Sequence, residues 1–191
     1  MLFGRYRSHR SVAAPAAVLA LALTLAFATG AAASGPAQNP AAAQFEVSFM
    51  RTTIDHHAMA VEMAQSCMRK ATLDRLRELC ANVAQAQLTE IDSLQTWLQS
   101  WYGQTKQPAM TAADEADMAD LDRRRGRDFS IAVARMFIQH HAGFLGDARS
   151  CVERAEHAPL RAMCAGMFRD QSREIRSFRR LLTEVRRGRP L

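Results

Sequence analysis

The chain has 191 residues, of which 48% are hydrophobic and 7% aromatic, so its length and composition allow one packed domain rich in helix-forming residues. The formal charge of +6 includes three arginines among the first ten residues, and without them 22 basic residues face 19 acidic ones. The remaining excess of +3 is spread over the predicted helices and the C-terminal tail. A nucleic-acid-binding protein needs a concentrated basic stripe with aromatic partners, so we exclude that class.

Residues 1–33 have the layout of a secretory signal peptide. A basic start precedes an uncharged apolar run, and Ala31 and Ala33 occupy the −3 and −1 positions of a cleavage site. Residues 34–43 are rich in alanine and proline, which predicts a flexible leader. We therefore expect export to the periplasm or the medium, with membrane attachment only through an uncleaved leader.

A long internal repeat fills most of the remaining chain. When the sequence is shifted by 84 residues, residues 45–91 align with residues 129–175 without a gap. Both histidine pairs and all four cysteines coincide in this alignment. A repeat of this length is one supersecondary unit, so we divide the chain into units 44–102 and 128–187 with a linker over 103–127.

Each repeat unit contains two amphipathic segments. Apolar residues spaced three and four apart predict helices over 43–69 and 72–101, and again over 128–153 and 158–187. The short connections make the two helices of a unit antiparallel neighbours, and a single hairpin cannot bury its apolar face alone. The expected fold is therefore an all-α four-helix bundle over 44–187. A short helix is expected after Thr111, in a linker long enough to leave the spatial order of the hairpins open.

Four cysteines in an exported protein indicate disulfides. Cys67 and Cys80 have the same spacing as Cys151 and Cys164, and each pair flanks a predicted hairpin turn on the inward faces of both helices. Antiparallel helices bring such positions within disulfide reach, so we predict Cys67–Cys80 and Cys151–Cys164. A thiolate metal site is the alternative, but the chain has no Cys-x-x-Cys spacing.

The same register predicts a polar layer at the histidine pairs. If Cys67 faces Cys80, then His57 faces Glu90 across the first hairpin, with Gln87 one turn away. The two halves of this predicted layer are His56, His57, Gln87 and Glu90, and His140, His141, Gln171 and Glu174. The apolar stripes predict that His56 and His140 lie centrally and that the other two histidines lie at the flank. Buried polar groups need partners, so the layer is either a hydrogen-bond network or a metal site.

Sulfur and carboxylate side chains near the histidines favour a metal. Met59 and Met63 follow His56 on nearly the same helix face, and Met136 lies one turn before His140. In the second unit Asp147 replaces Met63, and we expect it on the same inward stripe. Imidazole suits copper, zinc, iron and nickel, whereas thioethers select Cu(I). The chain lacks the Glu-x-x-His tetrad of di-iron bundles, which argues against an oxidase. The candidate ligands are His56, His57, Met59, Met63, Met136, His140, His141 and Asp147, backed by Gln87, Glu90, Gln171 and Glu174.

At these residues the sequence resembles a bacterial family known as domain of unknown function 305 (DUF305). The resemblance is carried by FEVSFMRTTIDHHAMAVEMA, more weakly by GRDFSIAVARMFIQHHAGFLGDA, and by the second-helix segment LRELCANVAQAQLTEIDSLQTWL. It covers residues 44–185 and implies a ferritin-like four-helix arrangement, export, and the copper binding or copper tolerance described for some members. Carried over by position, the family's ligands are His56, His57, Met59, Met63, His140 and His141. Thr53 and Phe137 stand where the family has methionine.

We therefore expect an exported metal-binding protein, most plausibly a copper carrier or buffer. We expect no catalytic role, since no nucleophile–base pair stands out in the sequence. The alternative is a metal-free envelope or interaction protein whose His/Gln/Glu layer is structural. The expected partner is a transition-metal ion, and the sequence leaves the oligomeric state open.

Overall fold

The computed structural model describes residues 35–186, and this part of the chain is all-α, as predicted. Within that range no helix has both the length and the apolar character that crossing a membrane requires. The predicted signal peptide and its cleavage site lie outside the described residues. The five helices are α1 (Pro40–Lys70), α2 (Asp74–Tyr102), α3 (Ala112–Arg123), α4 (Gly126–Arg154) and α5 (Ala158–Arg186).

Local capping chemistry sets the start of two helices. The Asn39 side chain accepts hydrogen bonds from the backbone N–H groups of Ala41 and Ala42, and Pro40 occupies the first helical position. Thr111 and Asp114 form a reciprocal capping box at the start of α3. These signals explain why α1 begins a few residues before the predicted position and why a helix forms in the linker.

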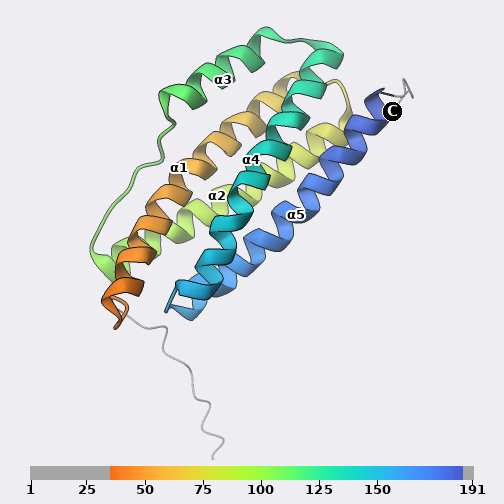
Figure 1. Ribbon diagram of the computed structural model, residues 1–191. Coiled ribbons are helices and arrows are strands. Elements are labelled where there is room, and N and C mark those ends of the chain that lie inside the picture. The colour runs from red at the N-terminus through yellow and green to blue at the C-terminus, as the bar shows by residue number, and fades with distance from the viewer. Residues whose placement is uncertain (1–34, 187–191) are drawn as a thin grey trace, which may run out of the picture. The chain divides into compact units, whose positions relative to one another are not determined.

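Two helical hairpins, α1–α2 and α4–α5, make up most of the domain (Figure 1). Each hairpin is closed by the predicted disulfide, with Cα–Cα distances of 6.2 Å for Cys67–Cys80 and 6.0 Å for Cys151–Cys164. The hairpins pack against each other mainly through α1 and α4, and α3 packs against both of these helices. Two disulfides in one small domain are typical of proteins that fold in an oxidising compartment.

Two apolar clusters lie on either side of the histidine layer. One gathers around Cys67 and Cys80 and includes Phe129, Phe137 and Phe178. The other gathers around the second disulfide and contains the residues Phe49, Ile54, Leu94, Leu98, Phe144 and Met167. Each cluster draws side chains from both hairpins, so the apolar packing holds the polar layer between them in place.

A buried carboxylate, which the sequence analysis did not identify, joins the start of α1 to the α4–α5 turn. Glu46 is fully buried and accepts hydrogen bonds from the Tyr102 hydroxyl at 2.7 Å and from the backbone N–H groups of Glu156 and His157 at 2.6 and 2.9 Å. The His157 ring lies 2.5 Å from the same carboxylate and 3.0 Å from the carbonyl of Gly35. Burial alone raises the pKa of Glu46, but the hydrogen bonds from Tyr102 and His157 outweigh it and lower the pKa.

Candidate metal site

The histidine layer lies where α1 crosses α4. His56 and His140, related by the repeat, stack with their ring centroids 3.7 Å apart. The other two histidines point into their own hairpins. The Nε2 atom of His57 lies 2.9 Å from Glu90 Oε2, and His141 Nε2 lies 2.9 Å from Glu174 Oε2. The predicted opposition of His57 and Glu90 is therefore confirmed.

The prediction that His56 and His140 occupy the centre of the core is wrong. His57 and His141 are the fully buried histidines, at 0% exposure, whereas His56 and His140 are partly exposed. The reason is that α1 packs against two helices at once, and adjacent residues on a helix point about 100° apart. His57 therefore faces α2 and His56 faces α4.

Burial controls the charge of this layer. It lowers the pKa of His56 and of His57 to about 3, and that of His140 to about 2, with neighbouring histidines adding to the effect. Burial and the nearby Glu174 carboxylate raise the pKa of Glu90 to about 7. These three imidazoles are therefore neutral at pH 7, and a neutral imidazole has the lone pair that a metal ion needs.

Several buried polar atoms of the layer have no hydrogen-bond partner within residues 35–186. They are Thr53 Oγ1, His56 Nδ1, His57 Nδ1, both ring nitrogens of His140 and His141, and the side-chain amides of Gln87 and Gln171. His141 Nε2 belongs to this set although Glu174 lies 2.9 Å away, because the two groups are not aligned for a hydrogen bond. The layer thus has more donors and acceptors than its own contacts satisfy, as a ligand-binding region would.

A pocket of about 150 Å³ opens beside His140. It is lined by three methionines, Met59 and Met63 from α1 and Met136 from α4, and by His140 itself. The rest of its wall consists of Gln139 from α4 and of Asp114 and Asp117 from α3. We call this the methionine pocket. It brings together four of the eight ligands suggested by the sequence.

The other four predicted ligands lie outside this pocket. His56 stacks on His140 without lining the pocket, and His57 and His141 face glutamates in their own hairpins. The prediction that Asp147 lies on the inward stripe is wrong, because its side chain is exposed. Burying an unpaired carboxylate is costly, whereas the thioether of Met63, its counterpart in the repeat, is readily buried.

Two residues of the pocket, Asp114 and Asp117, were missed by the sequence analysis. The acidic stretch that follows Thr111 was visible, but no sequence pattern shows that the linker helix lies over α1 and α4. Among residues 35–186, no three histidine, cysteine, aspartate or glutamate side chains lie close enough together to hold a metal ion. A metal in this arrangement would therefore need the thioethers.

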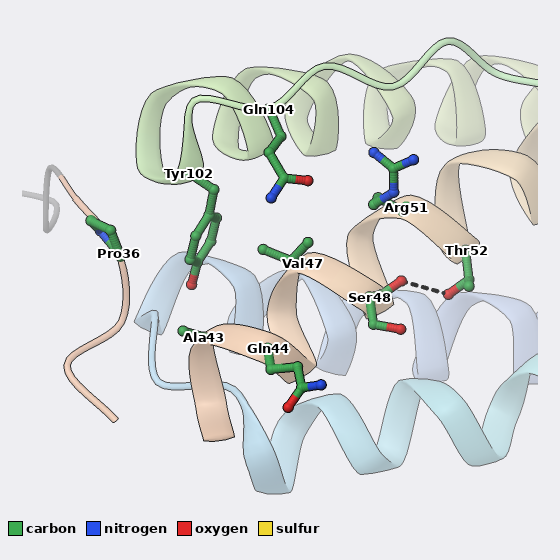
Figure 2. Close-up of a pocket in the computed structure, with 9 residues that line it drawn as sticks. All are labelled: Pro36, Ala43, Gln44, Val47, Ser48, Arg51, Thr52, Tyr102 and Gln104. Carbon is green, nitrogen blue, oxygen red and sulfur yellow. Dashed lines mark hydrogen bonds between the residues drawn. The ribbon is translucent and has the colours of Figure 1, made fainter. Parts of the chain in front are cut away.

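A second pocket, of about 580 Å³, lies along the first half of α1 (Figure 2). Arg51 is the charged side chain among the residues that line it, and these residues include no histidine, methionine or carboxylate. Thr52, the repeat counterpart of Met136, uses its hydroxyl there to donate a hydrogen bond to the Ser48 carbonyl at 3.0 Å. This pocket lacks the donors that a soft metal requires.

Fold and site together define an all-α, disulfide-braced protein of two repeated hairpins with a methionine–histidine pocket. The family model "Domain of unknown function (DUF305)" matches residues 46–182, and the chain therefore belongs to the DUF305 family. A comparison with curated protein sequences finds no match.

Solved structures share this fold. CopM in its Cu(II)-bound form is 23% identical, with 73% of this chain and 96% of CopM covered at a TM-score of 0.66. A DUF305 protein of Streptomyces coelicolor is 25% identical, with 74% and 92% covered at a TM-score of 0.66. A DUF305 fragment from Deinococcus radiodurans is 20% identical, with 78% and 99% covered at a TM-score of 0.68.

Proposed function

We propose that this chain is an exported protein that binds a soft transition-metal ion, copper above all, and carries or buffers it without catalysis. The supporting observation is the methionine pocket, in which Met59, Met63 and Met136 surround one side of His140. Thioethers bind Cu(I) in preference to harder ions, and a neutral imidazole adds a strong nitrogen ligand. We further propose that the two hairpins are a ferritin-like four-helix bundle.

The shared fold with CopM adds support of a different kind. CopM has been crystallised in Cu(I)-bound, Cu(II)-bound and silver-bound forms. The two disulfides fit the proposed export, because a copper-handling protein outside the cytoplasm meets an oxidising environment. Carriage or buffering is proposed in place of catalysis because the side chains of the pocket are metal donors and include no nucleophile paired with a base.

The inner histidines support a second proposal, that of a metal-free envelope or interaction protein with a structural polar layer. His57 and His141 are fully buried, and each lies 2.9 Å from a glutamate of its own hairpin. Such pairs fix the register of packed helices whether or not a metal is bound. In our proposal these inner pairs are structural, and His140 with the three methionines binds the ion.

Ag(I) competition with a chelating probe tests the proposal, because Ag(I) is a stable substitute for Cu(I). Replacing Met63 and Met136 together by leucine should weaken Ag(I) binding by more than about tenfold while nearly preserving core volume. Met167→Leu is the matched control, since Met167 is buried in the other apolar cluster. If the double variant keeps full Ag(I) affinity, the methionine pocket is not the metal site. The hypothesis of a metal-free envelope or interaction protein is then the better account.

A further inference from the structure

The three thioethers of the methionine pocket differ in their exposure to solvent. Met63 is fully buried and Met59 is 8% exposed, whereas Met136 on α4 is partly exposed. The pocket that they line has a volume of about 150 Å³, which is room for more than one water-sized molecule. A small oxidant can therefore reach the sulfur of Met136, while the surrounding apolar cluster shields that of Met63.

A thioether uses the same sulfur lone pairs to bind a soft metal ion and to accept an oxygen atom. Oxidation converts methionine into its sulfoxide, a polar group that methionine sulfoxide reductases convert back. The sulfoxide presents a hard oxygen, whereas Cu(I) selects soft ligands. Metal binding and oxidation at one sulfur therefore exclude each other.

The wall of the pocket can accommodate a sulfoxide at Met136. A sulfoxide oxygen accepts hydrogen bonds, and both ring nitrogens of His140 lack a partner within residues 35–186. A neutral imidazole carries an N–H on one of its nitrogens, and Gln139 adds a side-chain amide to the same wall. Oxidation of Met136 therefore places a polar group among donors, whereas oxidation of Met63 would place one inside an apolar cluster.

We propose that Met136 is a reversible oxidation site that controls metal binding by the methionine pocket. The oxidant is a peroxide: its O–O bond breaks, an S–O bond forms, and hydrogen peroxide leaves as water. The sulfur loses two electrons and the peroxide gains them. The pocket thereby loses one of its three soft donors and releases Cu(I), whereas an occupied pocket resists oxidation. This inference rests on the proposed function of the methionine pocket.

Peptide mapping of the full chain by mass spectrometry, after brief treatment with hydrogen peroxide, locates the sulfoxides. Met136 should be oxidised well before Met63. Ag(I) at about 100 times its Kd should slow oxidation of Met136 by more than about tenfold, since about 1% of the pockets are then free. Met163 is the matched control, because it is partly exposed beside the other apolar cluster and does not line the pocket. If Ag(I) protects Met163 as much as Met136, or protects neither, the oxidation site is wrong.

Ag(I) competition before and after peroxide treatment measures the consequence for binding. Oxidation should weaken Ag(I) binding by at least about tenfold, because the loss of even an indirect metal partner has an effect of that size. Methionine sulfoxide reductase should restore the affinity. Met136→Leu should bind Ag(I) weakly in both states, and Met163→Leu should respond to peroxide as the unmodified chain does.

Two results would overturn the control of binding by Met136. One is an unchanged Ag(I) affinity after Met136 is oxidised, and the other is an equal further loss when Met136→Leu is treated with peroxide. The proposed function fails separately and without any oxidant, if Ag(I) binding does not depend on Met63 and Met136.

Discussion

His56 and His140 are equivalent in the repeat, yet their surroundings differ. His140 has three methionines and α3 beside it. At the positions that correspond to Met59, Met63 and Met136, the other half of the molecule has Gly143, Asp147 and Thr52. All three of these replacements are exposed, and Thr52 lines the larger pocket of Figure 2. Three side chains and one helix therefore distinguish a soft-ligand pocket from an ordinary helix surface.

The features that stabilise the two hairpins, which we call the frame, occur in contrast in both halves of the molecule. Each hairpin has one disulfide and one histidine–glutamate contact at 2.9 Å. Even a cation over an aromatic ring is repeated, with Lys70 4.7 Å from the Phe129 ring centroid and Arg154 4.2 Å from that of Phe45. The repeat therefore encodes the frame, and residues that depart from it carry the proposed metal chemistry.

Removal of each disulfide in turn tests whether the two hairpins contribute equally to the free energy of unfolding. Replacing Cys67 and Cys80 together by alanine should cost about 3 kcal/mol of unfolding free energy, because the bridge closes a short loop in the unfolded chain. The corresponding change at Cys151 and Cys164 should cost the same, since the loop is the same length. Urea denaturation measures both. A difference above about 1 kcal/mol would show that the hairpins contribute unequally.

The hydrogen bonds of Glu46 have no equivalent in the second repeat unit. Their removal should have the next largest effect on the free energy of unfolding. The repeat counterpart of Glu46 is Ser130, whose hydroxyl donates to the Gly126 carbonyl at 3.1 Å. Glu46→Ala should cost about 2 kcal/mol, because it leaves the partly buried Tyr102 hydroxyl and the buried backbone N–H of His157 without an acceptor. Ser130→Ala should cost less than about 1 kcal/mol. Equal costs in thermal denaturation would contradict the special role of Glu46.

The same carboxylate predicts a pH dependence. The pKa of Glu46 is lowered from 4.5, so its contribution to stability is complete above pH 4.5 and is lost as the pH falls through the lower, folded-state pKa. The unmodified chain should therefore lose stability on acidification in this window, and Glu46→Gln should lose less. Denaturation midpoints measured from pH 6 to pH 3 test this. Parallel curves for the two proteins would be evidence against it.

The frame was predictable because it depends on periodicity and register. Spacing of three and four located all the long helices, and equal cysteine spacing gave both bridges. Once Cys67 is paired with Cys80, the position of Glu90 opposite His57 follows from helix geometry. These features involve neighbours within one hairpin, where the short connection between the helices fixes which residues lie opposite each other.

Contacts between the hairpins were not predictable in this way. The packing of α1, α3 and α4 decides which histidine faces α4 and whether Asp147 is exposed. The same packing places Asp114 and Asp117 in the wall of the pocket. Glu46 was missed for the same reason, because the backbone N–H groups of Glu156 and His157, which it accepts from, belong to the other hairpin. A single apolar stripe also cannot show that α1 buries two faces, one against α2 and one against α4.

The smallest expected effect is a gain of binding at His56. The substitutions Thr52→Met, Gly143→Met and Asp147→Met together recreate the methionine set on that side, and the helix surface at Gly143 is open enough to accept a side chain. We expect one additional Ag(I) to bind, more weakly than the first, since no helix within residues 35–186 covers this side as α3 covers the other. The same three positions changed to leucine provide the control for added apolar surface. If the methionine variant binds no more Ag(I) than the leucine variant, then thioethers beside a histidine are not sufficient for binding. In that case the methionine pocket depends on the cover that α3 provides, which the other half of the molecule does not have.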